Sequence, residues 1–515
     1  MVSGPIGDQS QGRDDFPRMI DSSAPVTKSN RYLILLLGLV AFLQVVCLRP
    51  GHQWGDDFAH YILQAKHLVT LHEFVAREYI PNPDVLNLGP QTLPPGLSVI
   101  LAPVYAAFGL NLAAMKIVLI LIFTGGLYFL DGLFADRLPQ PWRYALILLV
   151  GLSPYVFSLR DEIETEKAFV ALLLLTLWLT KRAFSPTGAR SMKLAILIGI
   201  CVFGMCATRN TGLAILPVFP LLDLLNSRPR RITWFSITII LTAGLLLSPI
   251  IILLHTTSGY AHLFNFSPLW IAQSALAFAK RFEIFWWGKD PRWPGNVTLV
   301  LVAVLAALGL FRDVRKHVGP AELFLPCYLA VNLPYFSPGF QLYLLPLYPL
   351  LVGYALIGFF NLAGGWRYRS AAIALGMSAV ALLFGTAFWK TNWGPIREGL
   401  EDPEFAAVCD FIHDKTVSTE IVVFRKPRLL ALLTEHPSTV YPMHLDRDPE
   451  PDEIWNYLVR VHASYVVVAH LDGPEFATDP IVDRTLVLHS LEAIPVFSNA
   501  HFKIYRLATS GPSIL

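Results

Sequence analysis

The sequence predicts a polytopic α-helical membrane protein with about eleven transmembrane helices and a small C-terminal α/β domain. Of the 515 residues, 54% are hydrophobic and only 15% are charged, whereas soluble domains contain about 25% charged residues. The mean hydropathy is +0.51, and a soluble chain of this size has too much surface to hide such an apolar excess. The same composition excludes a disordered chain, a collagen-like repeat and a small disulfide scaffold.

The charged residues divide the chain near residue 391. Residues 391–515 contain 28 of the 78 charged residues, 10 basic and 18 acidic, while residues 1–390 contain 30 basic and 20 acidic ones. The second part is therefore expected to be a soluble, acidic domain. The predicted division is a disordered cytoplasmic N-terminus over 1–30, a transmembrane region over 31–390 with long outer loops at 49–95 and 256–295, and an extracytoplasmic α/β domain over 391–515.

Eleven apolar runs are candidates for membrane helices, since a hydrocarbon core of about 30 Å needs roughly 20 residues of helix. The run 32–48 follows two cations, and no small-residue cleavage site follows it, so it is predicted to be an uncleaved first helix. The stretch 194–225 fits either two short helices or one broken helix. The remaining runs lie at 112–134, 142–158, 168–184, 194–208, 212–225, 232–255, 297–311, 321–336, 340–362 and 371–389.

The loops between these runs alternate in charge. With a cytoplasmic N-terminus, each inside loop contains arginine or lysine, as the positive-inside rule requires. Two outer loops instead collect acids, and an odd number of spans places the acidic tail outside. The basic residues of the predicted inside loops are Arg137, Arg143, Lys181, Arg182, Arg190, Lys193, Arg228, Arg230, Arg231, Arg312, Arg315, Lys316, Arg367 and Arg369.

The outer segments have patterns of their own. An amphipathic, interfacial helix is predicted over 57–75, followed by Pro94-Pro95-Gly96 and a short apolar run at 97–108. The loop 256–295 contains ten aromatic residues, which favours a position at the headgroup level of the bilayer. In the tail, strands are predicted at 420–424, 465–469, 494–498 and 502–507, with helices near 401–413, 427–434, 451–462 and 479–489.

The neighbouring carboxylates Asp56 and Asp57 directly follow the first apolar run and open the helical pattern. A carboxylate at this position can cap the helix and interact with its dipole. Alternatively, one of them is a general base at the water–lipid boundary, where partial desolvation raises a carboxyl pKa. The spacing alone leaves both readings open.

A second acidic group lies in the loop Arg160-Asp161-Glu162-Ile163-Glu164-Thr165-Glu166. Four acids in six positions could bind a divalent cation through oxygen ligands, or they could form a solvated loop. Glu166 stands at the start of the following helix. Four histidines of the first outer loop, His52, His60, His67 and His72, are spaced too widely for a typical zinc site.

Arg209 interrupts an apolar stretch on the predicted outer side, in Thr208-Arg209-Asn210-Thr211-Gly212. An arginine at the membrane boundary is a functional candidate because burying it without a partner is costly. Its planar guanidinium suits phosphate oxygens. The alternative is an arginine that extends to the interface without a chemical role.

These pieces, in this order, resemble the GT-C class of membrane glycosyltransferases, and in particular the branch of protein O-mannosyltransferases and aminoarabinose transferases of lipid A. The resemblance rests on Asp57 opening the first outer loop, Pro94-Pro95-Gly96, Thr165-Glu166 before a helix, and Arg209 with Gly212. It extends over nearly the whole chain, including the outer α/β domain. One departure is the stretch Ser337–Pro349, in which Leu345-Pro346-Leu347-Tyr348-Pro349 is not preceded by the arginine that is often present in related sequences.

The resemblance implies an inverting transferase that takes a hexose or pentose from a polyprenyl-phosphate donor to a protein, lipid or glycan acceptor outside the cytoplasm. It implies Asp57 as the base with Asp56 in reserve, Glu166, Asp161 and Glu162 in acceptor or cation positioning, and Arg209 and Arg160 on the donor phosphate. A divalent metal between Asp57 and Glu166 is a further expectation, with no organic cofactor and no nucleic-acid partner. The expected location is a bacterial inner membrane, and the rival class is a transporter or flippase of lipid-linked saccharides.

Overall fold

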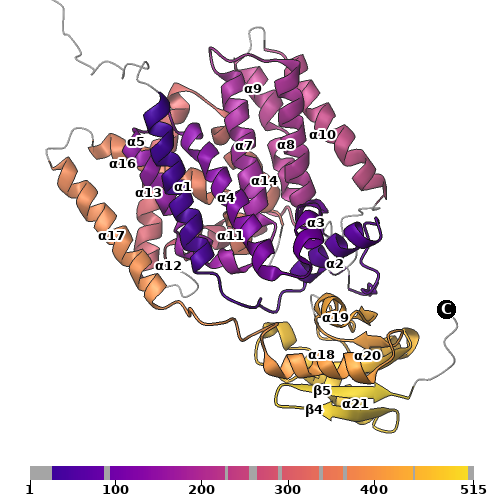
Figure 1. Cartoon of the computed structure of the whole chain (residues 1–515). Helices are drawn as coiled ribbons and strands as arrows, with labels where there is room; N and C mark the ends of the chain where they lie inside the picture. The colour runs from indigo at the N-terminus through magenta and orange to yellow at the C-terminus, as the bar shows by residue number, and fades with distance from the viewer. Residues whose placement is uncertain are drawn as a thin grey trace, which may run out of the picture.

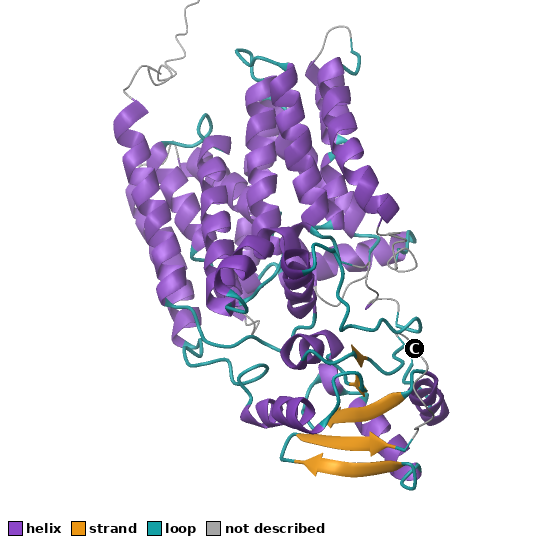
Figure 2. Ribbon diagram, turned by 45° about the vertical axis from the view of Figure 1, so that its right-hand side comes forward, coloured by secondary structure: helices purple, strands orange, loops and turns teal. Residues whose placement is uncertain are grey.

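The computed structural model describes residues 26–85, 88, 93–226, 230–253, 264–287, 293–335, 340–363, 368–444 and 447–508. A helical bundle forms one end of the molecule, and a sheet with its own helices forms the other (Figure 1). The same arrangement is seen after rotation, with all strands below the bundle (Figure 2).

Each of the eleven predicted apolar runs is helical. The stretch 194–225 is broken rather than continuous, because α8 ends at Thr208 and a 3-10 turn precedes α9. The helices of the bundle are α1 (Val26–Val46), α4 (Leu112–Leu133), α5 (Gln140–Gly151), α6 (Pro154–Ser158), η2 (Leu159–Asp161), α7 (Glu166–Phe184), α8 (Met192–Thr208), η3 (Asn210–Ile215), α9 (Val218–Asn226), α10 (Trp234–Leu253), α13 (Trp293–Lys316), α14 (Pro320–Asn332), α15 (Phe340–Leu344), α16 (Tyr348–Ala363) and α17 (Arg369–Trp389).

Within the described part of the chain, three helices are long and apolar enough to cross a membrane: Leu112–Leu133, Trp234–Ile252 and Val297–Lys316. A fourth span forms if Gln140–Gly151 and Pro154–Asp161, bent by 51°, count as one. The other helices offer shorter apolar stretches, such as Arg31–Val46 of α1 and Ile373–Trp389 of α17, so the predicted count of eleven spans is not confirmed. Short and broken helices cannot be recognised as such from hydropathy, which averages over the breaks.

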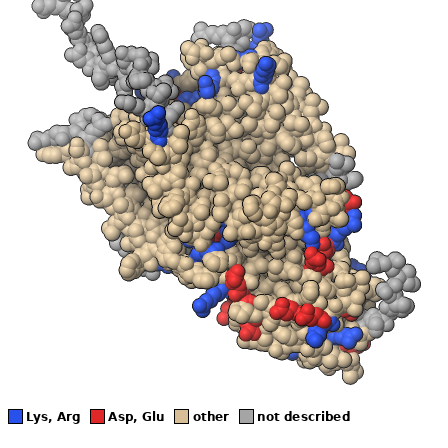
Figure 3. Space-filling view, in the orientation of Figure 1, with Lys and Arg blue, Asp and Glu red and all other residues tan. Residues whose placement is uncertain are grey.

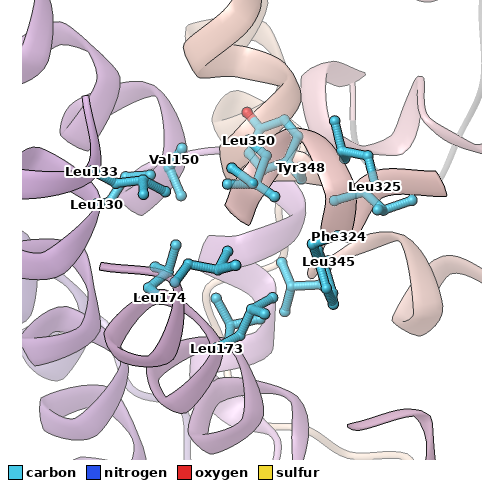
Figure 4. Close-up of a cluster of buried hydrophobic side chains, with 14 of the residues drawn as sticks. Leu130, Leu133, Val150, Leu173, Leu174, Phe324, Leu325, Leu345, Tyr348 and Leu350 are labelled. Carbon is cyan, nitrogen blue, oxygen red and sulfur yellow. The ribbon is translucent and has the colours of Figure 1, made fainter. Parts of the chain in front are cut away.

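The bundle is held by leucine-rich packing between helices that are distant in sequence. Leu130 and Leu133 of α4, Leu173 and Leu174 of α7 and Leu350 of α16 belong to one buried cluster (Figure 4). Small residues allow the closest approaches, since a Cβ built at Gly126 of α4 would lie 2.6 Å from the Ala171 backbone of α7. This cluster fixes the ends of α7 and α8, where the candidate site lies.

The outer loops contribute four more helices: α2 (Asp57–Thr70), α3 (Gly96–Phe108), α11 (Pro268–Arg281) and α12 (Ile284–Trp287). Nine of the fourteen residues of α2 are buried. Other parts of the protein therefore cover most of α2, and its position at the membrane interface stays a prediction. In the loop 256–295, Trp286 is 3% exposed and packs against Tyr348.

The C-terminal sheet has the order β2-β1-β3-β5-β4. β2, β1 and β3 are parallel, whereas β5 runs antiparallel to β3 and β4. Three of the four predicted strands match closely, the first is shorter, and the two-residue β2 was not predicted. The elements are α18 (Pro403–Lys415), β1 (Ile421–Val423), α19 (Pro427–Thr434), β2 (Ser438–Thr439), α20 (Pro451–Arg460), β3 (Ala463–Ala469), η5 (Pro474–Phe476), α21 (Asp479–Leu488), β4 (Ala493–Ser498) and β5 (Phe502–Leu507).

The sheet part is joined to the first outer loop by backbone and apolar contacts. The Ile80 N–H donates to the Ser438 carbonyl at 2.9 Å, and the Ser438 N–H donates to the Glu78 carbonyl at 2.7 Å, which extends the sheet beyond β2. Trp54 packs edge-on against Phe405 with ring centroids 5.0 Å apart. One buried cluster includes residues of α2, α3 and the sheet, so the first outer loop and the C-terminal region share a core.

On the face shown in Figure 3, acidic side chains gather over the sheet part and basic ones mark the opposite end of the bundle. This arrangement follows the division of charge seen along the sequence.

Candidate active site

The candidate site lies where the bundle meets the sheet part. Three helix ends provide it: the N-terminus of α2 with Asp57, the N-terminus of α7 with Glu166, and the C-terminus of α8 with Arg209. Residues that are about 150 positions apart in the chain are thus brought to one place. The four sequence motifs that suggested a site all belong to this region.

Asp57 is the carboxylate that remains accessible. Its side chain is 50% exposed, and its Oδ1 accepts a hydrogen bond from Nη1 of Arg428 at 2.9 Å. Because Asp57 is the first residue of α2, the unpaired N–H groups of the first turn favour its negative charge. The residue therefore combines a fixed backbone position with contact to solvent.

Asp56 has a different environment although it is the next residue. Its Oδ1 accepts the backbone N–H groups of Arg428 at 3.1 Å and Leu429 at 3.2 Å, so it caps the first turn of α19 from another part of the chain. Burial raises the pKa of Asp56, and the nearby Arg428 acts in the opposite direction. Asp56 thus has the geometry of a helix cap, and its role as a reserve base stays a prediction.

Asp161 and Arg160 face each other inside the protein. Asp161 is fully buried and accepts the N–H and Nε–H of Arg49 at 2.9 and 2.8 Å. Arg160 is 1% exposed and donates to the carbonyls of Cys47 at 2.7 Å and Phe157 at 2.9 Å. These bonds tie the segment after α1 to η2 and its preceding turn, while Nη2 of Arg160 lies 3.3 Å from Oδ2 of Asp161 without a hydrogen bond.

Glu162 lies beside His52, with 3.5 Å between Oε2 and Nε2. The Ile163 N–H donates to Nε2 of His52 at 3.0 Å, and Nδ1 lies 3.0 Å from the Gln53 carbonyl. A backbone N–H can only donate, so Nε2 carries no proton and the imidazole is neutral. Burial lowers the pKa of His52 to about 4, which agrees with this assignment, and His52 holds the acid loop in place.

Glu166 and Arg209 form an ion pair. Glu166 is 2% exposed, and the Arg209 side chain is 14% exposed. Nη1 of Arg209 also lies 3.4 Å from Oγ1 of Thr165, and its guanidinium stacks 4.7 Å from the Tyr343 ring of α15. Arg209 is therefore a positioned cation at the bundle's end and retains some exposure.

Glu164 is a residue that the sequence did not single out among the four acids of its loop. Burial, then Asp57 and Glu162, raise the pKa of the Glu164 carboxyl to about 8, while Arg209 and Lys167 act in the opposite direction. These influences place Glu164 among Asp57, Glu162 and Arg209. The only signal in the sequence was the density of acids in this loop, which does not distinguish one of the four acids from another.

Two glycines explain why these helix ends approach so closely. A Cβ at Gly96 would lie 2.6 Å from the Ala207 carbonyl oxygen, and a Cβ at Gly212 would lie 2.8 Å from the Cys206 backbone nitrogen. Gly96 thus lets α3 touch the end of α8, directly before Arg209. Gly212 lets the following turn fold back on the same helix.

Arg428 is the second residue that sequence analysis missed. It is fully buried on α19, and it reaches the site from the C-terminal region, 371 positions from Asp57. The cluster Arg425, Lys426 and Arg428 inside an acidic tail was a weak signal at most. Of the stretch Ser337–Pro349 that departs from the related sequences, 337–339 lie outside the described residues, and the rest contains α15 and the start of α16.

Among the residues that the structure describes, no three His, Cys, Asp or Glu side chains are grouped so that they could hold a metal ion. Asp57 faces Arg428 and Glu166 faces Arg209. Each of the two carboxylates expected to bind a divalent cation thus faces an arginine in this structure, and the cation between them stays a prediction.

The fold is shared with solved membrane transferases. The chain is similar to the crystal structure of ArnT from Cupriavidus metallidurans bound to undecaprenyl phosphate, with a TM-score of 0.59, 12% identity and coverage of 94% of this chain and 100% of that chain. It is also similar to the solved structure of the archaeal oligosaccharyltransferase AglB from Archaeoglobus fulgidus in complex with an inhibitory peptide and a dolichol-phosphate, with a TM-score of 0.57, 11% identity and coverage of 85% of this chain and 69% of that chain. The arabinofuranosyltransferase AftD from Mycobacteria is similar over 95% of this chain and 42% of its own (0.57, 16%).

No family model matches the chain, and no curated protein is significantly similar to it in sequence. At these identities the likeness is one of fold. The resemblance to the GT-C class, including the branch with aminoarabinose transferases, is confirmed at that level.

Proposed function

We propose that this chain is a glycosyltransferase of the inner membrane, which moves a sugar from a polyprenyl-phosphate donor to an acceptor on the outer side. The observation that carries the proposal is one half-exposed carboxylate, Asp57, at the site where Arg209 lies, within a fold shared with transferases. The similar ArnT and AglB structures contain undecaprenyl phosphate and dolichol-phosphate. A polyprenyl chain needs apolar surface, and the bundle provides it directly beside the site.

In the proposed reaction, an acceptor hydroxyl attacks the anomeric carbon of the donor sugar. The new C–O bond forms as the bond from that carbon to the phosphate oxygen breaks, and the configuration inverts. Asp57 takes the hydroxyl proton as general base. Arg209 stabilises the negative charge that grows on the leaving phosphate, and Glu166 holds Arg209 in position.

The remaining predicted residues take supporting parts in this proposal. Arg160 and Asp161 hold the acid loop through their buried contacts, so the donor phosphate is assigned to Arg209 rather than to Arg160. Glu162 and Glu164 line the approach to Asp57 on the acceptor side. No step is routed through a metal ion. In this proposal the donor sugar is a hexose or pentose, and the acceptor is a protein, lipid or glycan. The sheet part lies on the outer side of the membrane.

Asp57→Asn tests the catalytic assignment. Labelled polyprenyl-phosphate sugars and candidate acceptors are added to purified protein in liposomes, and the rate at which labelled sugar appears on the acceptor is measured. An amide cannot take the proton, so the rate should fall by at least about 100-fold, with an unchanged thermal transition showing an intact fold.

Asp84→Asn is the matched control, since Asp84 lies in the same outer loop and pairs with Arg460 at 2.5 Å, away from the site. It should transfer sugar at the wild-type rate. Wild-type activity in Asp57→Asn would remove Asp57 from the mechanism. Movement of labelled donor across the bilayer without transfer would favour the flippase instead.

A further inference from the structure

Arg428 belongs to the C-terminal region, yet the contacts of its side chain lie in the first outer loop. Nη1 donates to Oδ1 of Asp57 at 2.9 Å, and Nη2 donates to the Leu88 carbonyl at 2.9 Å. The guanidinium lies 4.9 Å from the Tyr79 ring centroid, and Nε lies 3.7 Å from Oδ2 of Asp56. A single side chain therefore joins α19 to the carboxylate proposed as the base.

Attachment of the sheet part does not by itself explain a fully buried arginine. The shared apolar core, the Asp56 cap and the hydrogen bonds at Ser438 already join the two parts. Peripheral ion pairs, Arg460 with Asp84 and Lys66 with Glu435, lie at the same interface. Because the desolvation cost of a buried ion pair offsets most of its attraction, such a pair contributes little to stability compared with apolar packing.

The geometry does explain what the arginine does for Asp57. A carboxylate held through one oxygen is restricted in rotamer and orientation, and half of the Asp57 side chain remains exposed. General bases work when a partner group holds them within hydrogen-bonding reach of the proton, as in catalytic triads. The bond to Leu88 fixes the guanidinium in turn.

We propose that Arg428 is a positioning residue that orients the Asp57 carboxylate, so that the C-terminal region completes the active site instead of only covering it. The inference rests on the proposed transferase function. It assigns the C-terminal region a part in the rate of the reaction, in addition to any part in acceptor binding.

The first test compares Arg428→Met, which keeps the unbranched stem but removes the charge, with Arg428→Lys in the liposome transfer assay. Arg428→Met should lower kcat by at least about 10-fold with little change in the KM of the acceptor, because misorientation acts on the reacting geometry. Arg428→Lys should recover part of that loss. Arg460→Met, which removes another cation from the same interface, should keep the wild-type kcat.

The second test uses complementary lengths. Asp57→Glu extends the carboxylate by one methylene, and Arg428→Lys gives a cation with a shorter, more adaptable reach. If Arg428 acts through Asp57, the double variant should be more active than the product of the two single effects. A residue that only stabilises the interface would give independent, multiplicative effects, and thermal transitions of all variants are recorded beside the rates.

The outcomes separate the two proposals. A wild-type protein that transfers sugar while Arg428→Met keeps its kcat overturns the positioning role alone. Multiplicative effects in the double variant also overturn the positioning role. This second test does not need Arg428→Met, so it still applies if that variant does not fold. A wild-type protein that transfers no sugar from any polyprenyl-phosphate donor overturns the transferase function itself.

Discussion

At the scale of single residues, two adjacent aspartates illustrate how identical side chains differ through their partners. Asp56 meets two backbone N–H groups of α19, and Asp57 meets a guanidinium and solvent. The sequence offered both as caps or bases. Only the direction of each side chain at the start of α2 separates the two, since consecutive helical residues point about 100° apart.

Glu164 provides a pH-dependent prediction. Its pKa is raised from the ordinary 4.5 to about 8, so the folded protein binds this proton more tightly than the unfolded chain does. The contribution to stability therefore falls as pH rises from about 4.5 to about 8. Glu164→Gln, which resembles the protonated acid, should raise Tm by about 2 °C or more at pH 8.5 and leave it unchanged at pH 4.5.

The control for this prediction is Glu73→Gln in the first outer loop, where Glu73 is exposed and pairs with Arg77. It should change Tm little at either pH, because exposed ion pairs contribute little to stability. A Glu164→Gln variant with the same Tm as wild type at pH 8.5 would show that the carboxyl carries no such proton. Thermal scans in detergent at both pH values measure the difference.

At the scale of elements, the site depends on close approaches between helix ends rather than on any one helix. α3 begins at Gly96 against the last turn of α8, and Arg209 follows that turn directly. A larger residue at this contact must move backbone, because the nearest atoms are the Ala207 carbonyl and not a flexible side chain.

Gly96→Ala should therefore displace Arg209 and weaken donor use. The expected result is a fall of at least about 10-fold in kcat/KM for the polyprenyl-phosphate donor, measured at saturating acceptor. Gly125→Ala is the control, since a Cβ there meets nothing within 4 Å in the middle of α4. If both variants behave alike, the approach of α3 to α8 does not position the arginine.

At the scale of the whole molecule, the first outer loop is the structural link between bundle and sheet. It contributes helix α2 to the shared core, residues 78–80 to the edge of the sheet, and Asp56 to the N-terminus of α19. Composition therefore divides the sequence near residue 391, whereas the packing joins parts of the chain before and after this residue in one core.

Asp56→Ala should weaken this link. It removes the acceptor of two N–H groups, and loss of a helix cap costs about 1–2 kcal/mol. The variant should show a lower Tm and faster proteolysis of the segment 391–402, which follows α17. Asp56→Asn keeps one oxygen acceptor and should be affected less, so equal losses in both variants would mean that the cap is not what holds α19.

The sequence by itself determined the membrane class, the eleven helical runs, most of the sheet and three of the polar positions that meet at the site: Asp57, Glu166 and Arg209. Hydrophobicity and helical or strand periodicity are local properties, so they can be read from the sequence without knowledge of the fold. Tertiary structure alone decided that Asp56 caps α19, that Arg160 and Asp161 bond within the protein, that the half-buried Glu164 lies near Asp57, and that Arg428 reaches Asp57. Those outcomes depend on partners brought together by packing across as many as 373 positions of chain, a distance over which no local pattern carries information.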